Sequence, residues 1–395
     1  MRASVRRAAA SLPTPCGVID LEAFDRNILA MAQRAGGMPI RVASKSLRTR
    51  AALERVLEHP GFRGILAFTL PEAIMLARDG HEDVVLGYPT TNRDALRELR
   101  SDAQLRERIT LMIDAVEHLD FFDAVAPGPG VLRVAMEGDV SWWPAKPLLR
   151  GHLHYGVFRS SIREAAQAAA FARTVKARKG VRLVGVMAYE SQVAGLPDAA
   201  HTPRGAAIRV IRQQSLADVP RRRGEMVEAV RDVAGELEFV NGGGTGSLES
   251  TSADPSVTEI AAGSGFFSPA SFDRFRGFQH EAAAFFGLDV VRKPTAEIVT
   301  LHGGGWSASG KPGADRLPVI DWPRGLHYLH EEGAGEVQTP ITGHAARGLE
   351  IGDRVWLRHV KAGELAERIT DFAVVKDGII EHFWKTYRGE GFAYL

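Results

Sequence analysis

The stretch PIRVASKSLRT, running from Pro39 to Thr49, sets the pattern that the rest of the chain repeats. Its segment Ile40–Ala43 is short and mostly apolar, which predicts a buried β-strand. Lys45 follows directly, and a helix is predicted to begin after it. In a barrel of β/α units, catalytic residues stand at the carboxyl ends of strands, so Lys45 is a candidate amine nucleophile. The alternative is an ordinary solvated lysine, which is the commoner environment of this residue.

Strand-like and helix-like segments alternate from residue 30 to residue 277, where we place the first domain. The predicted strands are Ile40–Ala43, Gly64–Phe68, Asp83–Leu86, Ile109–Ile113, Val131–Met136, Arg182–Met187, Leu237–Val240 and Ser256–Ala261. The predicted helices are Leu47–Leu57, Pro71–Arg78, Asn92–Leu99, Val116–Phe122, Ser161–Arg178 and Pro203–Ala234, the last broken at Pro220. Eight strands joined by crossovers predict an α/β protein with a closed (β/α)8 barrel of the TIM type, and a doubly wound open sheet is the alternative.

The sequence changes character after Phe278. Short strand-like segments with turn residues between them predict an all-β domain over residues 278–395. The predicted strands are Pro294–Leu301, Gly335–Thr339, Arg354–Arg358, Ile369–Val375 and Gly378–Phe383. Lys376-Asp377-Gly378 is a hairpin signal. The apolar segment Gly17–Ile19 precedes the first barrel strand, so we expect part of residues 1–29 to join this second domain.

Composition limits the function classes. The net charge of +1 gives no field that favours nucleic acid or a membrane surface. The single cysteine, Cys16, excludes a disulfide framework and a cysteine zinc site within one chain, and it is compatible with a cytoplasmic location. No apolar run is long enough to span a bilayer. The first residues lack the apolar core of a secretory signal, so we expect a ragged terminus. The basic run Arg221-Arg222-Arg223 is expected to be a solvated helix start and not a binding patch.

Two glycine clusters follow the last two predicted barrel strands. The first is Asn241-Gly242-Gly243-Gly244-Thr245-Gly246-Ser247, and the second is Ala262-Gly263-Ser264-Gly265. Glycines let backbone N–H groups approach an anion closely, and these two positions of a barrel commonly hold a phosphate. With Lys45 after the first strand, the implied ligand has a phosphate at one end and an amine-reactive carbonyl at the other. Pyridoxal 5′-phosphate fits that description.

At this point the chain resembles the fold-type III pyridoxal-phosphate enzymes. The resemblance is carried by Thr14-Pro15, Val18-Ile19-Asp20-Leu21, Lys45, Val240-Asn241-Gly242-Gly243-Gly244-Thr245 and Gly352-Asp353-Arg354-Val355. Within this group the chain is most similar to the D-threonine aldolase / D-serine dehydratase-like branch, also called amino acid deaminase/aldolase. The resemblance implies an alanine-racemase-like barrel with an appended C-terminal β domain, and a homodimer in which that domain completes the partner's site. It also implies that Lys45 forms the Schiff base with the cofactor.

Further residues carry over from the resemblance. Tyr155-Gly156-Val157-Phe158-Arg159-Ser160 is similar to a family segment whose arginine faces the cofactor's phenolate oxygen, which implies that role for Arg159. A surface ion pair is the alternative. Tyr189 is implied to contact the cofactor ring. Gln192 stands where relatives have histidine, so this chain lacks a histidine base there. Gly243, Gly244, Thr245, Gly246, Gly263 and Ser264 are the implied phosphate-side contacts.

The metal site of the relatives is altered here. D-Threonine aldolases and D-serine dehydratases carry a His-x-Asp or His-x-Cys pair that holds a divalent cation. This chain has His359 but Lys361 at the second position, and Glu331-Glu332-Gly333 lacks the relatives' upstream histidine. A protonated lysine is a poor ligand. If a metal binds, His359 and Glu364 are its candidate ligands. Otherwise His359 is a hydrogen-bonded histidine at a domain interface.

These expectations together describe a pyridoxal-phosphate lyase acting on a small D-amino acid with a β-hydroxyl, of the D-serine or D-threonine type. Dehydration with loss of ammonia and retro-aldol cleavage are both open outcomes. An amino acid racemase of the same fold and a non-catalytic carrier of the cofactor are the alternatives. We hypothesise that Lys361, oriented by Glu364, replaces the metal and donates a proton to the departing hydroxyl, which favours deamination. A solvent-facing Lys361 is the competing interpretation.

Overall fold

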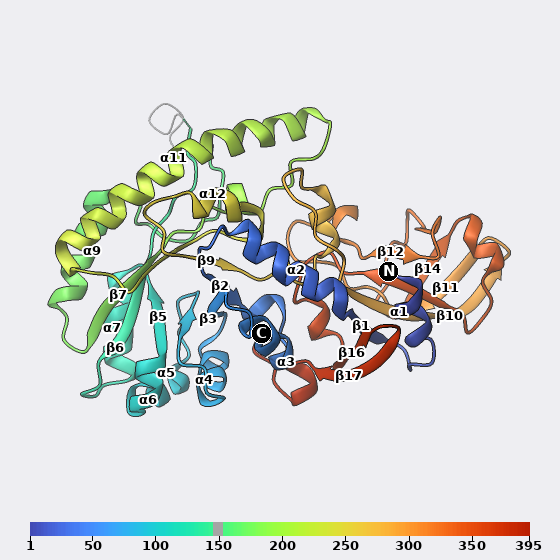
Figure 1. Ribbon diagram of the computed structural model, residues 1–395, viewed down its shortest axis with the longest axis horizontal. Coiled ribbons are helices and arrows are strands. Elements are labelled where there is room, and N and C mark those ends of the chain that lie inside the picture. The colour runs from blue at the N-terminus through green and yellow to red at the C-terminus, as the bar shows by residue number, and fades with distance from the viewer. Residues whose placement is uncertain (145–152) are drawn as a thin grey trace.

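The computed structural model describes residues 1–144 and 153–395 and contains two domains side by side (Figure 1). Within those residues, eight parallel strands close into a barrel in chain order, and the last pairs with the first through Ile40 and Ile260. The strands are β2 (Ile40–Ala43), β3 (Phe62–Ala67), β4 (Val84–Leu86), β5 (Ile109–Ile113), β6 (Leu132–Glu137), β7 (Val181–Met187), β8 (Phe239–Gly242) and β9 (Glu259–Ala262). The predicted closed (β/α)8 barrel is confirmed, and the open-sheet alternative is excluded.

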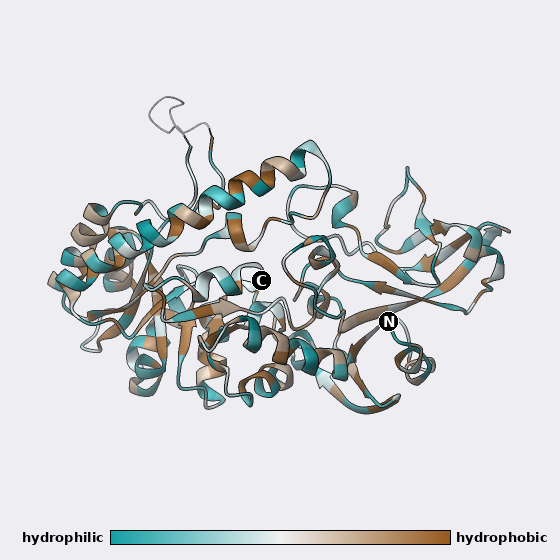
Figure 2. Ribbon diagram, turned by 45° about the horizontal axis from the view of Figure 1, so that its top comes forward, coloured by the Kyte–Doolittle hydropathy of each residue, from teal (hydrophilic) through white to brown (hydrophobic). Residues whose placement is uncertain are grey.

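Helices connect the strands on the outside of the barrel. They are α3 (Arg50–Leu57), α4 (Leu70–Arg78), α5 (Arg93–Ser101), α6 (Ala103–Arg108), α7 (Val116–Val125), α9 (Ala165–Ala177), α10 (Ser191–Ala194), α11 (Pro203–Ala234) and α12 (Leu248–Ser252). The barrel strands are largely apolar, whereas polar and apolar residues alternate along α11 (Figure 2). This pattern is typical of helices that cover a buried sheet on one side and face water on the other.

The predicted break at Pro220 is wrong. Helix α11 continues through this proline as one element, which extends beyond the barrel toward the side of the β domain (Figure 1). A proline inside a helix removes one backbone hydrogen bond and costs about 3 kcal/mol. Buried side chains on both sides of it, including Val219 and Met226, hold the helix against the barrel. Packing of the two halves therefore outweighs the local cost.

The second domain is built on a mostly antiparallel sheet. Its strands, in the described residues, are β1 (Cys16–Asp20), β10 (Ala284–Thr295), β11 (Ile298–His302), β12 (Val319–Trp322), β13 (His327–Tyr328), β14 (Gln338–Thr342), β15 (Arg354–Arg358), β16 (Asp371–Lys376) and β17 (Ile379–Lys385). Strand β1 lies between β10, which is antiparallel to it, and β16, which is parallel. The segment before the first barrel strand is thus part of this sheet. Helix α2 (Leu21–Arg34) then leads into the barrel, capped by Asp20.

Two predictions from the sequence concern this sheet, and one of them is wrong. The single predicted strand Pro294–Leu301 is wrong, because it spans the turn between β10 and β11. Its Pro294 belongs to the end of a twelve-residue strand that begins at Ala284. The hairpin signal is confirmed: Asp377 and Gly378 connect β16 and β17, with φ of 51° and 75°. Two consecutive positive φ angles are what the tight hairpin turn requires.

The expectation of a ragged amino terminus is also wrong. Residues Ala3–Ala8 form helix α1, and the side chain of Val5 is fully buried against the β domain. The terminal amine lies 2.7 Å from Asp321, and Arg2 pairs with Asp20. A buried apolar side chain and two ion pairs hold the terminus on the sheet. Sequence composition missed this helix because it is only six residues long.

The β domain contacts the mouth of the barrel at the segment that carries Lys45. Arg48, just after Lys45, has an ion pair with Glu367 of the β domain and also donates to the Lys45 carbonyl. The hydroxyl of Tyr387 donates to Glu72 of the barrel over 3.0 Å, and both side chains are buried. These contacts fix the position of the two domains relative to each other. Among the residues described, no helix is long and apolar enough to cross a membrane.

Candidate active site

Lys45 stands at the barrel mouth, in the short 3-10 turn Ser44–Ser46 that follows β2. The residues on either side of it, Ser44 and Ser46, are buried, whereas the Lys45 side chain is exposed to a cavity of about 1160 Å³. This cavity is also lined by residues from the ends of other barrel strands and from the β domain. The sequence-based placement of Lys45 on the catalytic edge of the barrel agrees with this geometry.

The amine of Lys45 is held by an aromatic neighbour. Its Nζ donates a hydrogen bond of 2.6 Å to the hydroxyl of Tyr88, which follows β4. The guanidinium of Arg159 lies 5.2 Å from the Tyr88 ring centre and 5.3 Å from that of Tyr189. Arg159 also donates to Glu137 over 3.2 Å. Four side chains from different barrel elements therefore converge on one side of Lys45.

The charges in this group change its acidities. Burial alone would raise the pKa of Tyr88, but the positive charges of Lys45 and Arg159 and the hydrogen bond from Lys45 lower it overall. Burial raises the pKa of Tyr189 to about 12, so its hydroxyl stays protonated. Burial also raises the pKa of Glu137, against the opposing effect of Arg159. Of the two hydroxyls, Tyr88 is therefore the one prepared to release a proton.

Both glycine clusters reach the same cavity. Gly243, Gly244, Thr245, Gly263 and Ser264 line it, as the sequence predicts. The hydroxyl of Ser264 lies 3.2 Å from that of Ser46, which joins the second cluster to the Lys45 turn. A side chain at Gly263 would meet the Ala43 carbonyl at 2.5 Å, so the close approach requires glycine. Gly246 is different, because it packs behind the loop and is not among the residues that line the cavity.

A buried carboxylate supports the first glycine loop. Glu190 accepts hydrogen bonds from the backbone N–H of Gly243 over 3.0 Å and from the Ser247 hydroxyl over 3.2 Å. It also pairs with Arg223 of α11, whose guanidinium binds Asp254 as well. The side chain of Arg223 is 1% exposed, so the prediction of a solvated basic run is wrong at this position. Arg221 is exposed, as expected. The run is split because a helix buries only one of its faces.

Gln192 does not face the cavity. Its side chain is buried and donates to the Val140 carbonyl over 2.9 Å. Gln192 is thus a packing residue, away from the cavity. Among the residues that line the cavity, the groups able to exchange protons beside Lys45 are Tyr88 and Tyr189.

The β domain supplies the opposite wall of the cavity. Lys361, Glu364 and Ser309 all line it. The Nζ of Lys361 donates to the Ser309 hydroxyl over 3.1 Å, and the backbone N–H of Ser309 donates to both Glu364 oxygens over 3.1 and 3.3 Å. Burial lowers the pKa of Lys361. The charge of Glu364 raises this pKa, and the charges of Arg316 and Lys45 lower it further. The Lys361 side chain is half-buried in this wall and bonded to Ser309.

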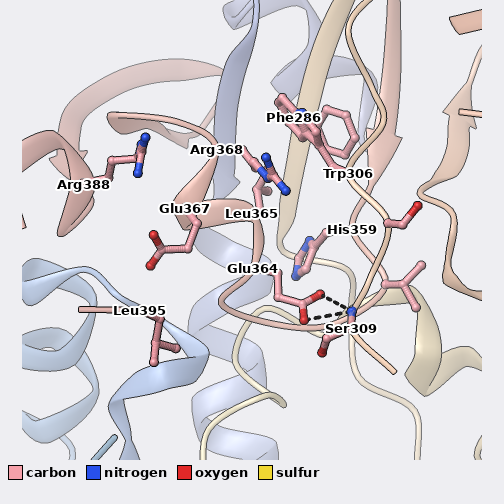
Figure 3. A pocket seen from close by; sticks show the side chains of 12 residues that line it. Phe286, Trp306, Ser309, His359, Glu364, Leu365, Glu367, Arg368, Arg388 and Leu395 are labelled. Carbon is pink, nitrogen blue, oxygen red and sulfur yellow. Dashed lines mark hydrogen bonds between the residues drawn. The ribbon is translucent and has the colours of Figure 1, made fainter. Parts of the chain in front are cut away.

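His359 lies next to this wall but in a separate, smaller cavity of about 420 Å³ (Figure 3). Ser309 and Glu364 line both cavities. The His359 side chain is buried, and burial lowers its pKa to about 3, so the ring is neutral. In residues 1–144 and 153–395, no group of three or more histidine, cysteine, aspartate or glutamate side chains is arranged to hold a metal ion.

Several residues of this site, among them Tyr88, Glu137, Glu190 and Ser309, were not singled out from the sequence. Tyr88 directly follows the third barrel strand, so the same strand-end rule that selected Lys45 would have found it. Glu190 gives no sequence signal, because its partners Gly243, Ser247 and Arg223 come from two separate segments, the first glycine cluster and helix α11. Ser309 lies in an irregular loop between β11 and β12. Only the folded chain brings it beside Lys361.

Comparisons with known proteins agree with this architecture. The family model described as alanine racemase, N-terminal domain, matches residues 19–223. D-threonine aldolase of Arthrobacter sp. is 24% identical over 385 residues, which cover 95% of this chain and 92% of that protein. A 3-hydroxy-D-aspartate aldolase of Paracoccus denitrificans is 25% identical over 400 residues, covering 96% and 93%. The structure of D-threo-3-hydroxyaspartate dehydratase from Delftia sp. HT23 superposes with a TM-score of 0.72 at 21% identity, covering 96% and 98%.

Proposed function

Because this chain belongs to the alanine racemase N-terminal domain family, we propose that it is a pyridoxal-phosphate-dependent lyase acting on small D-amino acids that carry a β-hydroxyl. The two aldolases that match along nearly the whole chain support this substrate class. One structural observation carries the proposal most directly. The Lys45 side chain enters a cavity that both glycine clusters also line, so an amine and a phosphate-binding loop face one space.

The residues of the barrel mouth fit pyridoxal 5′-phosphate. Gly243, Gly244, Thr245, Gly263 and Ser264 would hold its phosphate, with the loop kept in shape by Glu190. Arg159 and Tyr189 would contact its ring, and Lys45 would bond covalently to its aldehyde carbon. When bound, this cofactor accepts the electron pair released at the substrate Cα.

The protein's own groups orient the reacting atoms. Tyr88 holds the Lys45 amine at one position and offers a hydroxyl whose pKa is lowered, which suits transfer of a proton beside that amine. The cationic Arg159 is fixed between two tyrosine rings and Glu137, so it presents a constant positive charge to the cavity. Lys361 and Ser309 face this group from the β domain.

Two outcomes follow from the same substrate. Removal of the Cα proton and loss of the β-hydroxyl give a 2-oxo acid and ammonia, whereas cleavage of the Cα–Cβ bond gives glycine and an aldehyde. The fold match to a dehydratase supports the first outcome, and the sequence matches to aldolases support the second. We favour deamination, because the wall that faces Lys45 carries a hydrogen-bond donor, Lys361. Racemisation is the competing enzymatic function. A non-catalytic cofactor carrier is disfavoured, because residues of the appended β domain form part of the cavity lining.

The proposal extends to assembly and location. We propose a homodimer, on the resemblance to the fold-type III enzymes, although Lys361 lines the same cavity as Lys45 of its own chain. Light scattering at assay concentration tests this. We also propose a cytoplasmic location, which the single unpaired Cys16 supports.

The decisive experiment separates cofactor binding from chemistry. Protein incubated with pyridoxal phosphate and reduced with borohydride should carry the pyridoxyl group on Lys45, as detected by peptide mass spectrometry, and Lys45→Ala should carry none there. Label on another lysine would contradict the site. With D-threonine, ammonia and 2-oxobutanoate are the expected products. Glycine and acetaldehyde would instead identify an aldolase, and conversion to L-threonine alone would identify a racemase.

A further inference from the structure

The wall between the two cavities is a single hydrogen-bonded unit. Ser309 contributes its hydroxyl to Lys361 and its backbone N–H to Glu364. Because Ser309 and Glu364 line both cavities, this unit lies between the space that holds Lys45 and the smaller one that holds His359. The three residues come from two segments of the β domain that meet only in the folded chain.

The same place does not fit a divalent metal. A metal site needs several convergent ligands that carry lone pairs, typically four or more including water. His359 offers a neutral ring with both nitrogens buried and no hydrogen-bond partner. Lys361 occupies the position of the second ligand in the relatives and presents an ammonium instead. Both oxygens of Glu364 already accept from Ser309. The ammonium of Lys361 would repel a divalent cation. The single unpaired imidazole of His359 is too few ligands to hold one against that repulsion.

The loop that carries Lys361 is fixed to the Lys45 turn. Gly363 has a φ of +86°, and a Cβ at this position would lie 1.8 Å from the Lys45 carbonyl oxygen. The two backbones therefore touch, which sets the distance between the two lysines. Arg316 and Asp315 also line the cavity and pair with each other, so the wall holds the positive charges of Lys361 and Arg316 and the carboxylates of Glu364 and Asp315. Arg316 is thus balanced by Asp315, whereas the ammonium of Lys361 is bound to the neutral hydroxyl of Ser309.

We propose that Lys361, held by Ser309 and Glu364, takes the place of the relatives' divalent metal as the positive charge that contacts the substrate's β-oxygen, so that this chain works without a metal. The inference rests on the proposed function, because it assigns Lys361 to the β-substituent of that substrate. It makes Lys361 a residue that touches the substrate, while Ser309 and Glu364 position it. His359 is left as a buried neutral ring in the neighbouring cavity.

Metal binding tests the inference independently of any activity. The full chain loaded with pyridoxal phosphate is titrated with Mn²⁺ and with Zn²⁺ by calorimetry, in wild-type, Lys361→Asp and Lys361→Met forms. Wild type and Lys361→Met should show no saturable site. Lys361→Asp should instead bind one equivalent of metal saturably, since a carboxylate near His359 and Glu364 supplies the missing ligand. Saturable binding of one equivalent by wild type would overturn the inference. A Lys361→Asp protein that gains no binding would overturn it too, because position 361 would then not face a cation site.

Activity supplies the second measurement. Turnover of the D-β-hydroxy amino acid by wild type should be unchanged by EDTA, and Lys361→Met should lower kcat by about 10²–10⁴-fold while the borohydride label on Lys45 is retained. Lys361→Arg, which keeps the positive charge, should recover part of the rate. Loss of wild-type activity in EDTA with recovery in Mn²⁺ would overturn the inference. Absence of any lyase activity, with normal label on Lys45 and no metal binding, would instead count against the proposed function alone.

Discussion

The hydroxyl of Tyr88 lies 2.6 Å from Nζ of Lys45, and this contact joins the ends of the first and third barrel strands. Arg159 packs over the other part of the same ring. The Lys45 amine and the Arg159 guanidinium therefore both lie next to the Tyr88 side chain. Their positive charges lower the pKa of its hydroxyl, although burial acts in the opposite direction. A hydroxyl with a lowered pKa beside the reactive amine is suited to hold that amine in position and to exchange a proton with it.

Replacing Tyr88 with phenylalanine should separate these roles. The ring still packs against Arg159, so we expect Tyr88→Phe to fold normally and to retain the pyridoxyl label on Lys45. Loss of the hydroxyl should lower kcat by about 10²-fold, at the low end for one acid–base group. Steady-state kinetics over a range of pH measure this, with Tyr155→Phe as control, because that ring stacks on Trp142 and is not among the residues that line the cavity. An unchanged kcat would show that the hydroxyl has no part in turnover.

Glu190 should be essential to the first glycine loop. In Glu190→Gln the buried Arg223 loses half of its charge compensation, and we expect a loss of about 3–5 kcal/mol in the free energy of unfolding. Affinity for pyridoxal phosphate should fall as well, because the Gly243 N–H loses a charged acceptor. Arg221→Gln is the control on the same helix, since its exposed ion pairs contribute at most about 1 kcal/mol. Denaturant unfolding and cofactor titration measure both effects. Equal stabilities for the two variants would contradict this account.

Much of the fold could be predicted because its signals are local. Each barrel strand is a short apolar run, and the chain order of strands and helices defines a parallel sheet. The same regularity brings Lys45 and the glycines at 243 and 263 to one mouth, since the carboxyl ends of parallel strands share an edge. These residues were found without any knowledge of tertiary contacts. Their roles toward the cofactor came from the resemblance to a family.

The rest could not be predicted because it depends on which surfaces meet. Arg223 is one of three adjacent arginines, and only packing of α11 on the barrel decides that it is the buried one. Pro220 suggests a break by its own chemistry, and the burial of its neighbours overrides it. Gly246 shares a motif with Gly244 but is not among the residues that line the cavity. Ser309 has no pattern at all, so its contact with Lys361 exists only in the folded β domain.

Glu72 should make stability depend on pH. Burial raises its pKa from 4.5 to about 7, even though the Phe68 N–H and the Tyr387 hydroxyl both donate to it. The folded state thus favours the protonated form, so this group's contribution to stability is complete below pH 4.5 and is lost as the pH rises through about 7. Between these limits the loss amounts to roughly 3 kcal/mol.

Glu72→Gln should remove that dependence, because glutamine does not titrate. We expect the variant to gain stability relative to wild type as the pH rises from 4.5 to 8, by up to about 3 kcal/mol. Urea unfolding of both proteins at several pH values measures the difference, in which the titration of the groups they share cancels. Two parallel stability curves would show that Glu72 is already ionised in the native protein, so that folding does not raise its pKa.

The contact between Gly363 and the Lys45 carbonyl should couple the β domain to the reactive lysine. Gly363→Ala places a methyl group 1.8 Å from that oxygen at a φ of +86°, so both strain and collision result. Gly352→Ala is the matched control, because its φ is +97° and a Cβ there meets nothing within 4 Å. Strain alone should cost the control about 1–2 kcal/mol of stability and leave turnover unchanged. Gly363→Ala should lose more stability and should also lower kcat, because the collision can be relieved only by moving the loop of Lys361 away from Lys45. Denaturant unfolding and steady-state kinetics compare the two variants, and equal effects in both would mean that the contact does not set the geometry of the site.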